Sequence, residues 1–184
     1  MLMQVSELMT EEIVCCMPGD TTQAAANLMK QHGVGAVLVV SELSDPLLEG
    51  IITDRDLCSG VVATAKNANT TQVFELMTPV PVTCLPEDSI EDCEQRMQEN
   101  QVRRIPVVNE FGRCVGILTQ ADLARYLPAA RVGETVREIS KPSAPDMSPL
   151  FVKDHFFCGA LQEEEQILLL NRRRAMRRET QVGQ

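Results

Sequence analysis

Two short motifs in the sequence combine a hydroxyl and a carboxylate side chain at the same spacing. Thr53 and Asp56 form the first Thr-x-x-Asp motif, and Thr119 and Asp122 form the second. A threonine hydroxyl can donate to a phosphate or ribose oxygen, and an ionised carboxylate can accept both hydroxyls of a ribose. Each motif begins a predicted helix, whose free N–H groups suit a phosphate. The alternative is a purely structural helix cap, because threonine and aspartate also serve that purpose.

Two adjacent arginines form a second element with possible chemistry. Arg103 and Arg104 precede an apolar run, whereas the corresponding residues of the first half, Gly35 and Ala36, carry no charge. A planar guanidinium suits bidentate contacts with phosphate. The alternative is that arginines at the start of a strand only present a charged side chain to solvent at the edge of the sheet. Residues 1–128 carry 18 acidic and 8 basic residues, a net charge of −10. An anionic ligand would therefore need local cations.

These residues lie within a sequence unit that occurs twice. Residues 5–10, VSELMT, recur as VFELMT at residues 73–78, and residues 50–57 line up with residues 116–123. Each copy predicts the order β-α-β-β-α, with a short extended piece at residues 13–16 and 80–84. Helices then begin at Asp20 and Asp88 in sequences that resemble a capping box. The paired apolar runs 34–40 with 49–52, and 102–108 with 114–118, predict buried hairpins.

The composition excludes several classes of function. The 184 residues carry a formal net charge of −9 with 3% aromatic residues, which argues against a general nucleic-acid binder. We read no membrane-spanning run and no signal peptide, and expect a cytoplasmic protein. The seven cysteines and two histidines show no paired metal-ligand spacing, so we predict neither a metal site nor catalytic residues. Most cysteines are expected to be small buried hydrophobic residues.

The doubled motifs resemble the tandem cystathionine-β-synthase (CBS) domain pair, or Bateman module, over about residues 1–127. The resemblance rests on the repeated V-x-E-L-M-T, on VRRIPVV at residues 102–108 and on G-x-x-T-x-x-D-L in both halves. It implies an α/β fold of two β-α-β-β-α CBS repeats, packed through their sheets with pseudo-two-fold symmetry, plus a C-terminal helical tail. We expect repeat 1 at residues 1–66, repeat 2 at residues 67–128, and a linker and helical tail at residues 129–184.

The resemblance also implies a ligand of the adenosyl class, namely AMP, ADP or ATP, with S-adenosylmethionine possible, in two clefts between the repeats. The first cleft would use Ile51, Thr53, Asp56, Val82, Thr83, Arg103, Arg104 and Pro106. The second would use Val14, Cys15, Gly35, Ala36, Ile117, Thr119 and Asp122. Because this assignment places both arginines in the first cleft, we expect the first cleft to hold a phosphorylated ligand more tightly.

The predicted function is that of a regulatory module, without enzymatic activity, that binds an adenine nucleotide and signals to a protein partner or within a homodimer. The alternative is an interaction or scaffold protein with vestigial clefts that acts through its C-terminal tail. In that tail we expect a helix over residues 131–140, a proline-marked linker, and a second helix over residues 161–179 that ends in five arginines. An enzyme remains a third hypothesis, which rests only on the unassigned cysteines.

Overall fold

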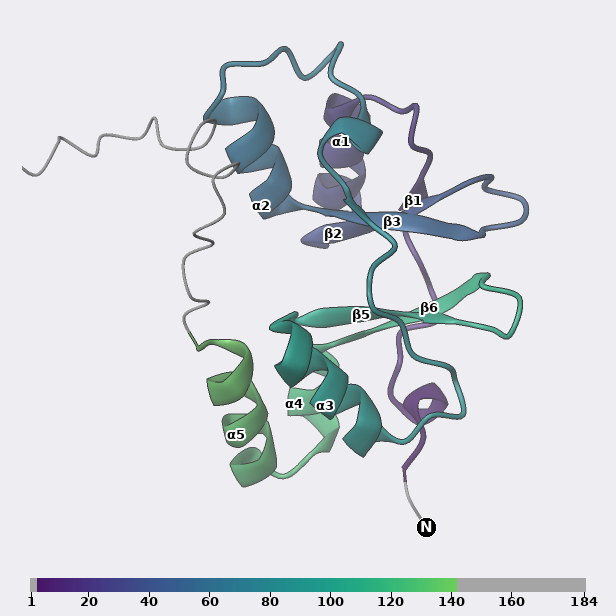
Figure 1. Ribbon diagram of the computed structural model, residues 1–184, viewed down its shortest axis with the longest axis vertical. Helices are drawn as coiled ribbons and strands as arrows, with labels where there is room; N and C mark the ends of the chain where they lie inside the picture. The colour runs from purple at the N-terminus through teal and green to yellow at the C-terminus, as the bar shows by residue number, and fades with distance from the viewer. Residues whose placement is uncertain (1–2, 142–184) are drawn as a thin grey trace, which may run out of the picture. The chain divides into compact units, whose positions relative to one another are not determined.

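A computed structural model describes residues 3–141 and shows the predicted order of elements in the first repeat and, apart from the strand expected at residues 80–84, in the second (Figure 1). The first repeat contains β1 (Cys15–Cys16), α1 (Thr22–His32), β2 (Ala36–Val40), β3 (Leu48–Thr53) and α2 (Asp54–Leu57), which continues as a π-helical turn (Cys58–Val62). The second contains β4 (Thr78–Pro79), α3 (Ile90–Asn100), β5 (Arg104–Val108), β6 (Cys114–Thr119), α4 (Gln120–Tyr126) and α5 (Ala129–Ile139).

The first strand differs between the repeats. In the first repeat β1 pairs in parallel with β2, and Leu38 N–H donates to the Val14 carbonyl at 3.0 Å. In the second repeat the equivalent pairing is a single bridge between Cys84 and Val107. Pro106 occupies the position of Leu38 and has no N–H to donate. One ladder bond is therefore lost, and the predicted extended piece at residues 80–84 is reduced to this bridge.

Helices α1 and α3 each begin one residue later than predicted. The N-cap of α1 is Thr21, whose hydroxyl accepts from Ala24 N–H at 3.2 Å, and the N-cap of α3 is Ser89. Asp20 and Asp88 instead accept hydrogen bonds from the backbone of Met17 and Leu85, which closes the turn before each helix. The proposed aspartate caps are therefore wrong, because each carboxylate binds a residue that precedes it.

The two hairpins face each other across an apolar layer. Strands β2 and β3 are antiparallel, as are β5 and β6. One buried cluster joins Leu38, Val40 and Ile51 of the first repeat to Val108 and Cys114 of the second. Figure 1 shows α1 and α2 on the outer side of the first sheet, with α3, α4 and α5 on the outer side of the second. The predicted packing of two CBS-like repeats through their sheets is confirmed.

The short segment that opens each repeat in the sequence packs on the other repeat. Val5 and Leu8 are buried in the core of the second repeat, together with Ile90 and Leu118. Val73 is buried in the core of the first repeat. Strand β4 accordingly pairs with β3, and the backbones of Thr10 and Ile117 exchange hydrogen bonds of 2.9 and 3.0 Å. The repeats thus exchange their leading segments, which the division at residue 66 did not anticipate.

The exchanged backbone passes closest at Gly50, in β3. A Cβ atom at this position would lie 2.8 Å from the Thr78 carbonyl oxygen and 2.9 Å from the Met77 sulfur. We expect Gly50→Ala to lower the free energy of unfolding by about 1–3 kcal/mol, because β4 has to move away from β3. Urea denaturation measures this change. Gly19→Ala is the control, since no atom lies within 4 Å of its Cβ position, and an equal loss in both variants would contradict the prediction.

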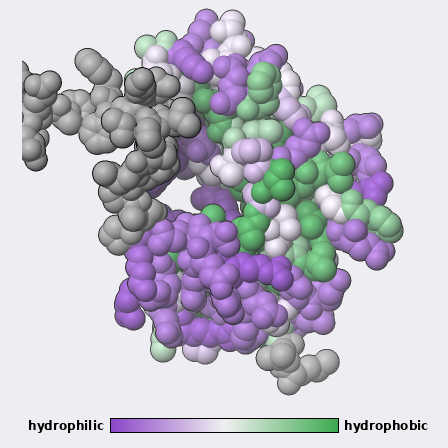
Figure 2. All heavy atoms as spheres, viewed as in Figure 1, coloured by the Kyte–Doolittle hydropathy of each residue, from purple (hydrophilic) through white to green (hydrophobic). Residues whose placement is uncertain are grey.

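Helix α5 extends the second repeat beyond residue 128. Ile139 joins the core of that repeat, and Thr135 is buried against α3. The helix expected over residues 131–140 is confirmed, with its start at Ala129. Figure 2 shows hydrophilic residues gathered over this half of the molecule, where α3 and α5 expose Glu91, Gln95 and Glu134. The remaining tail predictions lie outside the described residues.

Within residues 3–141, the helices are all too short or too polar to cross a membrane.

Candidate functional site

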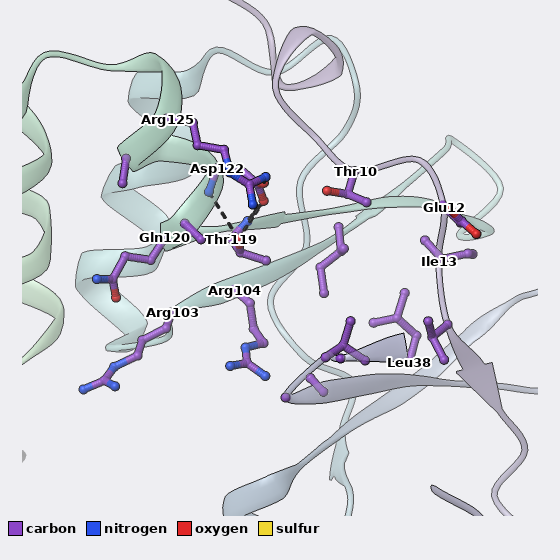
Figure 3. A pocket seen from close by; sticks show the side chains of 18 residues that line it. Thr10, Glu12, Ile13, Leu38, Arg103, Arg104, Thr119, Gln120, Asp122 and Arg125 are labelled. Atoms are coloured by element: carbon purple, nitrogen blue, oxygen red, sulfur yellow. Dashed lines mark hydrogen bonds and ion pairs between the residues drawn. The ribbon is translucent and has the colours of Figure 1, made fainter. Parts of the chain in front are cut away.

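A cavity of about 510 Å³ lies between the repeats, beside the second Thr-x-x-Asp motif (Figure 3). It brings together six of the seven residues predicted for the second cleft. These are Val14, Gly35, Ala36, Ile117, Thr119 and Asp122. The seventh, Cys15, packs against the apolar cluster between the sheets and does not line the cavity.

Both arginines line this same cavity, which differs from their predicted place in the first cleft. The register of the hairpin explains the difference: Arg104 in β5 lies opposite Thr119 in β6, and Gln120 N–H donates to the Arg103 carbonyl at 2.8 Å. The pair is therefore fixed beside the motif of its own repeat. Among residues 3–141, neither arginine takes part in an ion pair.

Five charged residues line the cavity, and two of them, Asp122 and Arg125, pair with each other. Arg103 and Arg104 lie towards one end, whereas Glu12 lies at the opposite end (Figure 3). The apolar side chain of Ile13 lies beside Glu12, and Leu38 lies between Ile13 and Arg104 in this view (Figure 3). The cavity therefore offers a cationic part and an apolar part to one ligand.

Gly35 marks a point where the two repeats approach closely. A Cβ atom on Gly35 would lie 3.1 Å from an Asp54 carboxylate oxygen and 3.4 Å from the guanidinium nitrogens of Arg104. The absence of a side chain at Gly35 thus leaves room for both charged groups. Arg104 consequently borders the start of α2 as well as the cavity.

The Thr-x-x-Asp motifs cap their helices, as the structural alternative predicted. Asp122 is buried, and its Oδ2 accepts from Thr119 N–H at 2.9 Å and from the Thr119 hydroxyl at 2.6 Å. Asp56 accepts the same two bonds from Thr53, at 2.8 and 2.7 Å. The other oxygen of Asp122 accepts from Arg125 at 3.2 Å. In the free protein each threonine proton is therefore directed at its aspartate rather than at the cavity.

The first-cleft residues have separate surroundings, and apart from the two arginines none lines the cavity. Ile51 and Pro106 are buried within strands, Val82 packs on the core of the second repeat, and the Thr83 carbonyl accepts from Arg96 at 2.9 Å. At the start of α2, the N–H groups of residues 54, 55 and 56 donate to Gly35, Asp54 and Thr53 respectively. A phosphate at this helix start would have to displace those bonds.

Sequence reasoning missed several lining residues. They come from the end of the first leading motif and the residues after it, from the turn after α1, from β2 and from α4: Thr10, Glu12, Ile13, Gly33, Val34, Leu38, Gln120, Ala121, Ala124 and Arg125. Arg125 had a usable signal, because it lies three residues after Asp122 on the same helix. Thr10 and Glu12 had none, since their position depends on the exchange of leading segments.

The geometry agrees with the family comparison. The family model for the CBS domain matches residues 5–63 and 73–129, one match for each repeat. The chain belongs to the CBS domain family. Both matches include a Thr-x-x-Asp motif, and both begin at the valine of an exchanged leading segment.

Relatives of this CBS protein include Hypoxic response protein 1 of Mycobacterium tuberculosis, which is 35% identical over 75% of this chain and 94% of its own length. The CBS domain-containing protein YhcV of Bacillus subtilis is 39% identical over 65% of this chain and 82% of its own. A crystal structure of Hypoxic Response Protein I with two coordinated zinc ions superposes with a TM-score of 0.61 at 34% identity, covering 68% of this chain and all of that one.

A second structure, the CBS domain protein PAE2072 of Pyrobaculum aerophilum complexed with AMP, superposes with a TM-score of 0.63. At 22% identity over 73% of this chain and 99% of that one, it shows the shared fold. In the described part of this CBS protein, no three His, Cys, Asp or Glu side chains gather as ligands for a metal ion.

Proposed function

We propose that the cavity binds an adenine nucleotide and that this CBS protein acts as a regulatory module rather than an enzyme. The observation that carries the proposal is the pair Arg103 and Arg104, two cations without ion-pair partners in the described residues, which line the same cavity as the apolar residues Ile13 and Leu38. Its volume of about 510 Å³ falls within the ~300–1,000 Å³ of typical small-molecule pockets.

In this arrangement the phosphate contacts the arginines and the base packs against the apolar residues Ile13 and Leu38. Guanidinium groups form charge-assisted hydrogen bonds with phosphate, which are stronger than neutral ones. The net charge of −10 on residues 1–128 otherwise repels an anion, so the two arginines decide its position. The AMP complex of PAE2072 supports a ligand of this class for the fold.

Regulation follows if the ligand prefers one arrangement of the two repeats. The cavity draws its lining from both repeats, and Arg104 of the second repeat approaches Asp54 of the first at Gly35. A phosphate bound to Arg104 adds negative charge close to Asp54 at this point between the repeats. We propose that the change is passed to a protein partner or to the second subunit of a homodimer.

A panel of ligands tests the proposal on the full-length protein. We expect AMP, ADP or ATP to raise the thermal midpoint, since a ligand at 100 times its Kd adds roughly 2.7 kcal/mol to stability. S-adenosylmethionine tests whether a cationic ligand is accepted, and inosine monophosphate tests recognition of the base. A midpoint unchanged by every adenosyl compound would refute nucleotide binding and favour the scaffold alternative. Light scattering with and without ligand tests the homodimer.

A further inference from the structure

Two cysteines of the second repeat form a buried pair away from the cavity. Cys84 lies in the bridge to β5 and Cys93 lies in the first turns of α3, and both are at most 1% exposed. Their sulfur atoms share a hydrogen bond at 2.7 Å. This separation is only about 0.7 Å longer than the ~2.05 Å of an S–S bond. A small movement of either side chain would therefore bring the sulfurs to bonding distance.

A cation lies beside this pair. Arg96 is one turn after Cys93 on α3, and its Nη1 donates to the Thr83 carbonyl at 2.9 Å and to Asp88 at 2.7 Å. These bonds hold the guanidinium next to the backbone that carries Cys84. The hydrogen bond with Cys93 lowers the pKa of the Cys84 thiol, and although burial opposes this shift, the charge of Arg96 adds to it. The same hydrogen bond, together with burial, raises the pKa of Cys93.

The other buried cysteines have different surroundings. Burial raises the pKa of Cys16 to about 12 and that of Cys114 to about 12. Because the thiolate is the reactive form of cysteine, these two thiols are poor nucleophiles. Cys84 thus combines an acidified thiol with a second thiol in contact, an arrangement suited to disulfide formation.

We propose that Cys84 and Cys93 are a redox-active dithiol, which a peroxide converts to an intramolecular disulfide. The Cys84 thiolate attacks one oxygen of the peroxide, the O–O bond breaks, and hydroxide leaves, which gives a sulfenic acid on Cys84. The Cys93 thiol then attacks that sulfur, the S–S bond forms, and the hydroxyl group leaves as water with the Cys93 proton. Two electrons pass from the two sulfurs to the peroxide, and the hydroxide takes up the proton that Cys84 lost on forming its thiolate, so that two waters are produced.

Hydrogen peroxide is small and uncharged, so it reaches the pair through local opening of the fold. One residue predicted for the first cleft, Thr83, lies next to the dithiol: it precedes Cys84 in the sequence, and its carbonyl accepts a hydrogen bond from Arg96. The dithiol itself is separate from the cavity, because none of Cys84, Cys93 and Arg96 lines it. Its test therefore does not depend on nucleotide binding.

Peptide mass analysis of the full-length protein tests the proposal directly. Trypsin cleaves after Lys66 and after Arg96 with no basic residue between them, so one peptide contains both cysteines. Reduced protein is treated with hydrogen peroxide below its thermal transition, quenched, and alkylated in acidic denaturant. We expect this peptide to escape alkylation and to weigh two hydrogens less than the reduced peptide. Its oxidation should be at least about tenfold faster than the loss of alkylation at Cys16 or Cys114. Dithiothreitol should restore both thiols.

Two variants serve as controls. Cys93→Ala removes the second thiol, so Cys84 should accumulate as a sulfenic acid that dimedone labels, whereas Cys114→Ala should leave the disulfide unchanged. If a variant fails to fold, the mass and alkylation of the wild-type peptide still show whether the disulfide forms. A peptide that stays fully alkylated, or that gains oxygen without losing two hydrogens, would overturn the proposal, as would oxidation of Cys16 and Cys114 at the same rate.

Discussion

Replacing Arg103 and Arg104 together with alanine is expected to weaken AMP binding by about 100-fold or more. A hydrogen bond to a charged group contributes about 1.5–3 kcal/mol, so removing two such bonds at once corresponds to at least a ~100-fold change in Kd. Adenosine lacks the phosphate and should bind both proteins within about threefold of each other. Calorimetry with AMP and with adenosine measures the two affinities.

A matched control separates local contacts from net charge. Replacing Lys30 and Arg137 together with alanine also removes two positive charges, but both residues are exposed and neither lines the cavity. We expect the AMP affinity of this control to stay near that of the wild type. Equal losses for AMP and adenosine in the variant without Arg103 and Arg104 would mean that the arginines shape the cavity without binding phosphate. An unchanged AMP affinity would exclude this cavity as the phosphate site.

Replacing Glu94 with alanine is expected to lower the free energy of unfolding by about 2–3 kcal/mol. The Glu94 carboxylate is buried in α3, where Oε2 accepts from Arg131 Nε at 2.6 Å and Oε1 accepts from the Thr135 hydroxyl at 2.8 Å. Its removal leaves both α5 donors without this acceptor. Arg131 is 34% exposed and regains some solvation, so the loss falls below the ~3–5 kcal/mol of a fully buried pair.

Glu91 provides the matched control for Glu94. It lies one turn earlier on α3 and pairs with the same Arg131, but its side chain is 44% exposed. An exposed ion pair contributes about 0–1 kcal/mol, so Glu91→Ala should change stability little. Urea denaturation measures both variants, and hydrogen exchange should show faster exchange across α5 in Glu94→Ala alone. Equal losses in the two variants would show that burial of Glu94 does not fix α5.

The elements of each repeat were predictable because their signals are local. Apolar runs and turn residues located both hairpins, and the Thr-x-x-Asp spacing located the starts of α2 and α4. The caps of α1 and α3 were misplaced because aspartate is followed by threonine or serine, each a good cap, and the sequence does not show which side chain turns back.

The division of residues between clefts was not predictable in the same way. Aligning the repeats showed that Arg104 corresponds to Ala36, but not which neighbours surround it in the pair. Its place depends on the register that sets Arg104 opposite Thr119 and on the contact at Gly35 between repeats. Likewise, a repeated V-x-E-L-M-T motif does not reveal which core its valine enters. Such contacts are long-range, and a repeat pattern carries no information on them.

The exchanged leading segments have a consequence for synthesis of the protein. Val5 and Leu8 leave the ribosome well before the other members of their core, because Ile90 and Leu118 follow more than 80 residues later. The first core is likewise incomplete until Val73 has been made. Loop closure over such separations slows folding, so the pair should gain its structure as one late cooperative event. A nascent chain stopped after the first repeat would expose the valine and leucine that the second repeat is built to cover.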